Sequence, residues 1–186
     1  KTLIYSYNAS YDDANSQLNE SSGQFALAYT AIENANLAIA GLRKYGNVEN
    51  NAGMRYLLGE ALVLRALYYH DLVKAWGDVP ARFQPIGETG DVIKPKSDRD
   101  VIYRQIISDL EEAVNYVYWP NESGKTGLTT RVNKAFAYGL LARVCLSAAG
   151  YSQRPDEGQI GTGNVGQNRR SRLTESGQAW GDGALY

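Results

Sequence analysis

A long apolar run at residues 54–80 constrains the fold more than any other part of the sequence. Its large apolar residues recur at steps of three and four, which is the period of an α-helix; they are Met54, Leu57, Leu58, Leu62, Leu64, Leu67, Tyr68, Leu72, Val73 and Trp76. These positions occupy well over half of the helix circumference, so other elements must cover more than one face. Gly77 can adopt the left-handed conformation that ends a helix, and Pro80 cannot continue one. The run therefore predicts a buried central helix.

Three further helices are expected around this one. Helical spacing of apolar residues runs through residues 24–45, through 97–117, and through 134–149. The order is therefore helix–turn–helix, linker, helix–turn–helix, and two stacked αα-hairpins are the simplest assembly that covers the central helix. We predict an all-α fold of tetratricopeptide-like stacked helical hairpins with long irregular loops.

The expected helix ends rest on particular residues. Ser97 followed by Asp100 has the spacing of a capping box at the start of the third helix. Asn133 is a plausible N-cap for the fourth helix, which Gly150 would close. Residues 81–96, with two prolines and two glycines, are expected to form an irregular connection.

The ends of the chain differ from this helical body. Residues 1–23 are polar apart from a short β-like piece at 3–7, and 121–130 form a polar turn. From Tyr151 onward, frequent glycines and few apolar positions give no periodicity. We therefore expect residues 1–150 to form the helical-hairpin region. Residues 151–186 would be a Gly-rich loop or truncated tail of the same domain.

Composition favours one domain and excludes some partners. The chain has 186 residues, 44% of them hydrophobic and 21% charged, which is ordinary for a globular domain. Its net charge is −1, with no basic stripe, so nucleic acid is not an expected partner. No segment approaches the roughly 18 consecutive apolar residues of a membrane-spanning helix. The first residues do not show a charged start followed by an apolar signal core. We therefore expect either that the protein is not exported or that this chain is an already processed or trimmed piece.

The sequence offers little for catalysis or metal binding. His70 is the only histidine, and we expect a hydrogen-bonded histidine within the packed helix; a catalytic base or a metal ligand is the alternative. Cys145 is the only cysteine and is expected to be a buried, inert thiol. A transition-metal site would have to rest on carboxylates alone. We predict no cofactor and no metal.

Three pairs of acids could suggest glycosidase chemistry, which needs two carboxylates held across a cleft. They are Asp12 with Asp13, Asp98 with Asp100, and Glu111 with Glu112. A polar loop, a helix start and a solvated helix face explain them more simply. The glycines between 158 and 166 lack the strand and helix that flank a phosphate-binding loop. We predict that the protein is not an enzyme.

Glu60 and Arg65 interrupt the most apolar helix of the chain. Five residues apart, they point about 140° away from each other and should not pair directly. We expect each to reach a partner on a neighbouring helix or a loop carbonyl, which would fix the register of the hairpins. Contact with a ligand is the alternative.

Loop aromatics are the better functional candidates, because the chain holds fourteen Tyr against three Phe. Aromatic rings stack on the flat C–H faces of sugars, and amides bind the hydroxyl groups. Trp119 also lies in a loop, and loop aromatics can instead cover an edge of the core. The candidate ligand-binding residues are Tyr11, Asn15, Asn19, Tyr151 and Trp180.

Four stretches together resemble the SusD/RagB family of outer-membrane nutrient-binding lipoproteins. The most specific is GEALVLRALYYHDLVKAWGDVP at 59–80. The others, in the family's order, are AYTAIENAN at 28–36, IISDLEEA within 103–113, and TRVNKA with LLARVCL within 130–146. The resemblance covers roughly residues 25–150.

The resemblance implies an all-helical binding protein without catalytic activity. Members are held on the cell surface by a lipid on an N-terminal cysteine, cap a SusC-like TonB-dependent transporter and capture oligosaccharides, or sometimes peptides, for it. This chain begins at Lys1 without that cysteine and is shorter than a usual member. The expected function is therefore glycan binding at the outer membrane. A helical-repeat scaffold for protein partners, without a glycan site of its own, is the alternative.

Overall fold

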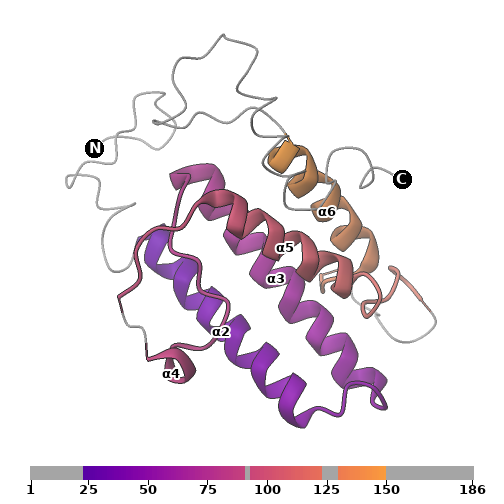
Figure 1. Ribbon diagram of the computed structural model, residues 1–186. Helices are drawn as coiled ribbons and strands as arrows, with labels where there is room; N and C mark the ends of the chain where they lie inside the picture. Colours follow the sequence, from indigo (N-terminus) through magenta and orange to yellow (C-terminus); the bar gives the residue numbers. More distant parts are fainter. Residues whose placement is uncertain (1–22, 91–92, 123–129, 150–186) are drawn as a thin grey trace.

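The computed structural model describes residues 23–90, 93–122 and 130–149, which form four long helices and one short one (Figure 1). The helices are α2 (Gln24–Tyr45), α3 (Ala52–Trp76), α4 (Ile86–Thr89), α5 (Arg99–Ala113) and α6 (Lys134–Ala149). The long helices lie side by side in the order α2, α3, α5, α6, and each packs mainly against its neighbours in that order. These residues contain no strand. The predicted all-α fold is confirmed.

The helices pair as two hairpins. A short turn at 46–51 returns the chain from α2 to the antiparallel α3 (Figure 1). The second hairpin places α5 against α3 and α6 against α5. Because a single hairpin leaves one face of each helix uncovered, stacking the two produces the continuous core.

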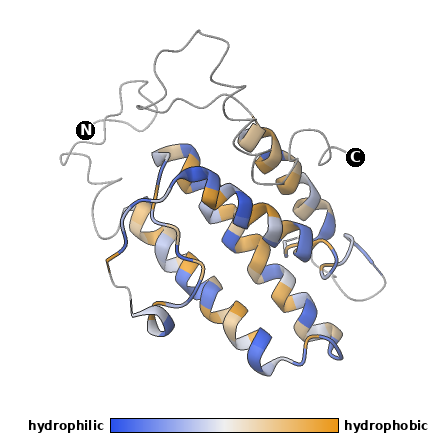
Figure 2. Ribbon diagram, in the orientation of Figure 1, coloured by the Kyte–Doolittle hydropathy of each residue, from blue (hydrophilic) through white to orange (hydrophobic). Residues whose placement is uncertain are grey.

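Helix α3 is the central helix that the sequence predicts. Leu62, Val63 and Ala66 have no exposed surface, and Figure 2 shows hydrophobic residues along much of the helix. A narrow stripe is an exception, because Leu57 is 40% exposed and Leu64 38% exposed. The apolar residues of α3 are therefore covered on more than one face, but not all round.

Two predicted helix ends, at Gly77 and Asn133, are confirmed, and Asn51 is an N-cap that the sequence analysis did not predict. Asn51 caps α3, since its Oδ1 accepts hydrogen bonds from the amides of Gly53 and Met54 at 3.1 and 3.2 Å. Gly77 ends the helix with φ of +74°. Asn133 caps α6, since its Oδ1 accepts from the Phe136 amide at 2.9 Å.

The predicted capping box at the start of α5 is wrong. Asp98, not Ser97, is the N-cap, and its Oδ1 accepts from the Asp100 amide at 2.7 Å. The Ser97 hydroxyl accepts instead from the Ala81 amide at 3.2 Å. The Ser97 side chain therefore binds the backbone of the preceding connection, and Asp98 caps the helix instead.

Helix α5 also ends earlier than predicted, at Ala113 rather than near residue 117. The amides of Tyr116 and Val117 both donate to the Ala113 carbonyl, at 2.9 and 3.0 Å, which forms a tight turn. Residues 114–119 are mostly β-branched or aromatic and have low helix propensity. The turn carries Val117 onto Gly59 of α3, so packing on α3 replaces a further helical turn.

The connection between α3 and α5 is less irregular than predicted, because it contains the single-turn helix α4. The Glu33 carboxylate of α2 accepts from the Ile86 amide at 2.9 Å and satisfies the first turn of α4. A side chain more than 50 residues away in sequence therefore stabilises this turn.

Candidate functional site

The five predicted ligand-binding residues are Tyr11, Asn15, Asn19, Tyr151 and Trp180, and all lie outside the described residues. Their grouping into one site stays a prediction. Of the loop aromatics that the sequence indicated as binding candidates, Trp119 alone is described. Three local arrangements in the described part of the chain carry polar or aromatic groups that could bind a ligand: a polar connection, a small pocket and an exposed pair of rings.

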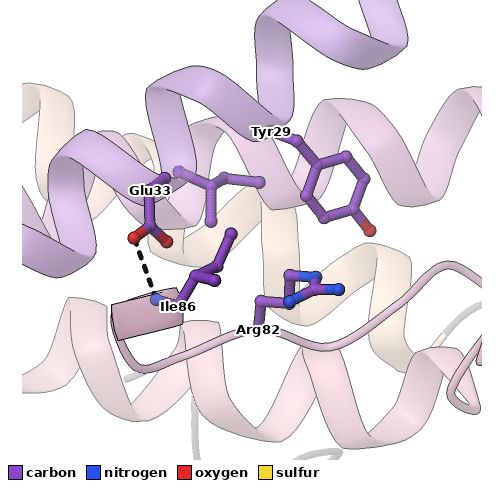
Figure 3. Close-up of a pocket in the computed structure, with 5 residues that line it drawn as sticks. Tyr29, Glu33, Arg82 and Ile86 are labelled. Carbon is purple, nitrogen blue, oxygen red and sulfur yellow. Dashed lines mark hydrogen bonds between the residues drawn. The ribbon is translucent and has the colours of Figure 1, made fainter. Parts of the chain in front are cut away.

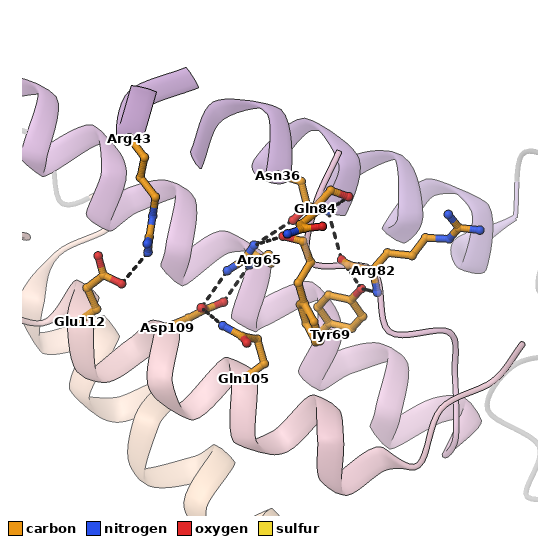
Figure 4. Close-up of polar contacts among 10 residues, drawn as sticks. Asn36, Arg43, Arg65, Tyr69, Arg82, Gln84, Gln105, Asp109 and Glu112 are labelled. Carbon is orange, nitrogen blue, oxygen red and sulfur yellow. Dashed lines mark hydrogen bonds and ion pairs between the residues drawn. The ribbon is translucent and has the colours of Figure 1, made fainter. Parts of the chain in front are cut away.

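The polar connection is residues 79–86, which we call the strap; it follows α3 and passes over α2 and α3 (Figure 4). The Tyr69 hydroxyl donates to the Arg82 carbonyl and accepts from the Arg82 amide, both at 2.6 Å. Asn36 donates to the Arg82 carbonyl at 3.1 Å and to the Gln84 carbonyl at 3.4 Å. Helix side chains thus hold the backbone of the strap.

Two further hydrogen bonds extend this pattern along the strap. The Tyr29 hydroxyl donates to the Pro80 carbonyl at 2.7 Å, and Arg65 Nη1 donates to the Phe83 carbonyl at 3.0 Å. Burial raises the pKa of both Tyr29 and Tyr69, so both phenols stay protonated and able to donate. The strap is a fixed piece of the fold.

Arg65 is at the centre of the buried polar contacts in Figure 4. Its Nε and Nη2 donate to the two carboxylate oxygens of Asp109 on α5, each at 2.8 Å. Its Nη1 also donates to Asn36 Oδ1 at 2.9 Å. Gln105 Nε2 donates to Asp109 at 2.8 Å. Arg65 therefore joins α2, α3, α5 and the strap, which confirms the predicted partners on a neighbouring helix and at a loop carbonyl.

Glu60 does not pair with Arg65, as predicted, but its partner is the side chain of a loop residue and not a neighbouring helix or a loop carbonyl. Arg131, just before α6, donates from Nε to Glu60 Oε1 at 3.0 Å and pairs with Oε2 through Nη2. The Tyr56 hydroxyl lies 3.1 Å from Glu60 Oε1. Burial, together with the Glu60 charge, raises the pKa of Tyr56 to about 12. This cluster fixes the entry to α6.

The pocket lies between α2 and the strap and has a volume of about 190 Å³ (Figure 3). Ile32 and Ile86 supply its apolar lining, and Tyr29, Glu33 and Arg82 supply its polar groups. The Tyr29 hydroxyl and the Glu33 carboxylate already bind the backbone of the strap and of α4. Small-molecule pockets usually measure roughly 300–1,000 Å³. The pocket is therefore a poor candidate for an oligosaccharide site.

The exposed rings are Trp119, in the connection after α5, and Tyr138, in α6. Their ring centroids are 5.9 Å apart with an angle of 25° between the planes, which is a stacked arrangement. Trp119 is 50% exposed and Tyr138 47% exposed. Sequence reasoning missed Tyr138 because it lies within a helix. Its position beside the buried stripe of Ala137 and Leu140 is the signal that indicates an outward-facing ring.

His70 and Cys145 are structural, as predicted. His70 is 1% exposed and its Nε2 lies 3.2 Å from the Ser147 hydroxyl of α6. Cys145 is buried, and burial raises the pKa of its thiol to about 11, so the reactive thiolate is disfavoured. Within the described ranges, no three His, Cys, Asp or Glu side chains are grouped to hold a metal ion.

The fold should lose stability in mild acid because of His70. Burial lowers the pKa of His70 below its usual 6.5, assisted by Lys74 and Arg143 and opposed by Asp71. As the pH falls below about 6.5, the unfolded chain takes up a proton before the folded chain does, which favours unfolding. Urea unfolding at about pH 7.5 and pH 5.5 measures the free energy of unfolding at each pH. The decrease between the two pH values should be smaller in His70→Asn than in the wild type. An equal loss in both would contradict this account.

Comparison with known proteins gives one consistent match. The family model SusD-like, described as "Starch-binding associating with outer membrane", matches residues 2–146. The SusD-like protein P38 of Formosa agariphila is 35% identical over 86 residues, which are 46% of this chain and 16% of that protein.

Solved structures show the same similarity. A SusD superfamily protein from Parabacteroides distasonis superposes with a TM-score of 0.63 and 28% identity, over 86% of this chain and 32% of that one. The surface glycan-binding protein A of Bacteroides fluxus superposes with a TM-score of 0.58 and 26% identity, over 83% of this chain and 28% of that one. The chain therefore spans between 16% and 32% of the length of these three proteins.

Proposed function

Because this chain belongs to the SusD-like family of starch-binding proteins that associate with the outer membrane, we propose that it is part of a cell-surface oligosaccharide-binding protein. This protein delivers its ligand to a SusC-like TonB-dependent transporter. It is held at the outer membrane by a lipid anchor and breaks no bond in the sugar. The single observation that carries this proposal is the family match over residues 2–146.

The similar structures and the described residues support glycan binding in different ways. One of the structures that resembles this chain is named a surface glycan-binding protein. In the described part of the chain, the histidine, the cysteine and the buried ion pair have structural roles. None of its helices meets the length and hydropathy needed to cross a membrane.

The ligand-contacting residues in this proposal are those of the loops before α2 and after α6. Tyr11, Tyr151 and Trp180 supply rings, and Asn15 and Asn19 supply amides for the hydroxyl groups. Replacing any of the three rings by Ala should weaken oligosaccharide binding by roughly 3- to 10-fold, which corresponds to the ~0.5–1.5 kcal/mol of an aromatic contact. Calorimetry with soluble α-1,4-, β-1,3- and β-1,4-linked glucans measures the change.

The alternative is a helical-repeat scaffold for a protein partner. The observation that favours it is the apolar surface left open on α3 and α6, where Leu57 is 40% exposed, Leu64 38% and Leu146 60%. The two functions separate in one experiment. If no soluble glycan binds and a TonB-dependent transporter still co-purifies with the chain, the scaffold is correct. Glycan binding that the ring substitutions weaken, with an unchanged thermal midpoint, supports the proposed function.

A further inference from the structure

Trp119 and Tyr138 form a ring pair that the fold holds in place. The Lys134 amide, at the start of α6, donates to the Tyr118 carbonyl at 2.7 Å, which ties the first turn of α6 to the residue before Trp119. The Trp119 amide donates to Glu122 Oε2 at 2.8 Å, which fixes the turn that carries the indole. These bonds hold the backbone that carries the two rings, so binding a ligand would require little reordering of that backbone.

The ring pair is not a part of the core that happens to reach the surface. The adjacent Tyr118 stacks on Tyr56, with centroids 5.0 Å apart and planes 8° apart, and it packs against the core. Trp119 and Tyr138 instead keep about half of their surface in water, at 50% and 47%. Two stacked, half-exposed rings present an apolar surface to solvent, and such surfaces commonly mark binding sites.

One basic and one acidic side chain lie near Trp119. Lys134 Nζ lies 5.9 Å from the centre of the Trp119 ring, and the Glu122 carboxylate lies beside the Trp119 amide. One positive and one negative group leave no net charge to select an acidic or a basic ligand. Apolar ring faces bordered by donors and acceptors match a neutral pyranose, which has a C–H face and a rim of hydroxyl groups.

We propose that Trp119 and Tyr138 form a contact surface for a neutral pyranose unit of the oligosaccharide. A sugar ring stacks on the ring pair, and Lys134 and Glu122 bind its hydroxyl groups. The proposal rests on the proposed function, since it adds a contact to a chain that binds glycans. It assigns a second surface, which is separate in sequence from the loops before α2 and after α6.

Calorimetry on the full 186-residue chain tests this surface, with α-1,4-, β-1,3- and β-1,4-linked glucan oligosaccharides as probes. Trp119→Ala and Tyr138→Ala should each weaken binding of the preferred probe by roughly 3- to 10-fold. Trp119→Phe, which keeps an aromatic ring, should stay within about threefold of the wild type. Tyr45→Ala is the matched control, because Tyr45 is an exposed ring (76%) at the end of α2; it should not change the affinity.

Fluorescence gives a second readout. Adding the preferred oligosaccharide should change the tryptophan emission of the wild type, and the change should be smaller in Trp119→Phe, although that variant still binds. Wild-type affinity in both Trp119→Ala and Tyr138→Ala, with weakened binding in Tyr11→Ala or Trp180→Ala, would overturn the ring-pair surface alone. If the wild-type chain binds none of the probes, both this surface and the proposed function are contradicted.

Discussion

Asp109→Leu should lower the free energy of unfolding by about 3–5 kcal/mol, because it leaves the Arg65 guanidinium buried without its counter-charge. The side chains of this ion pair are 4% and 2% exposed, so water cannot replace the lost carboxylate. Two of the hydrogen bonds of Arg65, both at 2.8 Å, would disappear together, and Gln105 would lose its acceptor. Urea unfolding monitored by circular dichroism measures the effect.

Glu112→Gln is the matched control for this prediction. Glu112, also on α5, pairs with Arg43 of α2 at 2.7 Å, but the two side chains are 31% and 52% exposed. An exposed pair of this kind contributes about 0–1 kcal/mol, so the control should be near wild type. The double variant Arg65→Met with Asp109→Leu should recover part of the loss, since no charge is left buried. Equal losses in Asp109→Leu and Glu112→Gln would show that Arg65 is not isolated from water.

Gly59→Ala should destabilise the fold by about 1–3 kcal/mol, although Ala is the better helix former. A Cβ at Gly59 would lie 2.8 Å from Val117 Cγ1 and 3.0 Å from Tyr116 Cβ, which is closer than side-chain carbons pack. The turn that follows α5 rests on this glycine, so the added methyl group must push the second hairpin away from α3. Chemical unfolding measures the change in free energy.

The same substitution at Gly41 should raise the free energy of unfolding, whereas at Gly59 it should lower it. Gly41 lies within α2, and a Cβ there would meet nothing within 4 Å. Replacing it by Ala removes the entropic cost of a helical glycine and should raise stability by about 0.5–1 kcal/mol. A loss of stability at Gly41, or a gain at Gly59, would contradict the close approach of α3 and the turn after α5.

Periodicity predicted the helices well because burial is repeated along them. Helices α2, α3 and α6 have the expected bounds to within a few residues, since apolar residues every three to four positions must face the core. The role of Arg65 was predictable for a related reason. A charged residue in the middle of the most buried helix needs a partner, whatever that partner is.

Features without periodicity were not predictable. The strap is held by side-chain to backbone hydrogen bonds from Tyr69, Asn36 and Arg65, and no spacing in the sequence encodes them. The end of α5 depends on the approach of Val117 to Gly59, which are 58 residues apart and meet through tertiary packing alone. Tyr138 was overlooked because it lies within a helix, whereas the search for binding residues was confined to loop aromatics.

The strap has an evolutionary consequence. Its path is set by its own carbonyl and amide groups, which every amino acid except proline provides in full, and by side chains that belong to other elements. Outward residues such as Gln84 can therefore change identity from one homologue to another without altering the course of the main chain. Asn36, Arg65 and Tyr69 do not have this freedom. Across relatives, these three helical positions should therefore vary less in amino-acid identity than the residues of the strap.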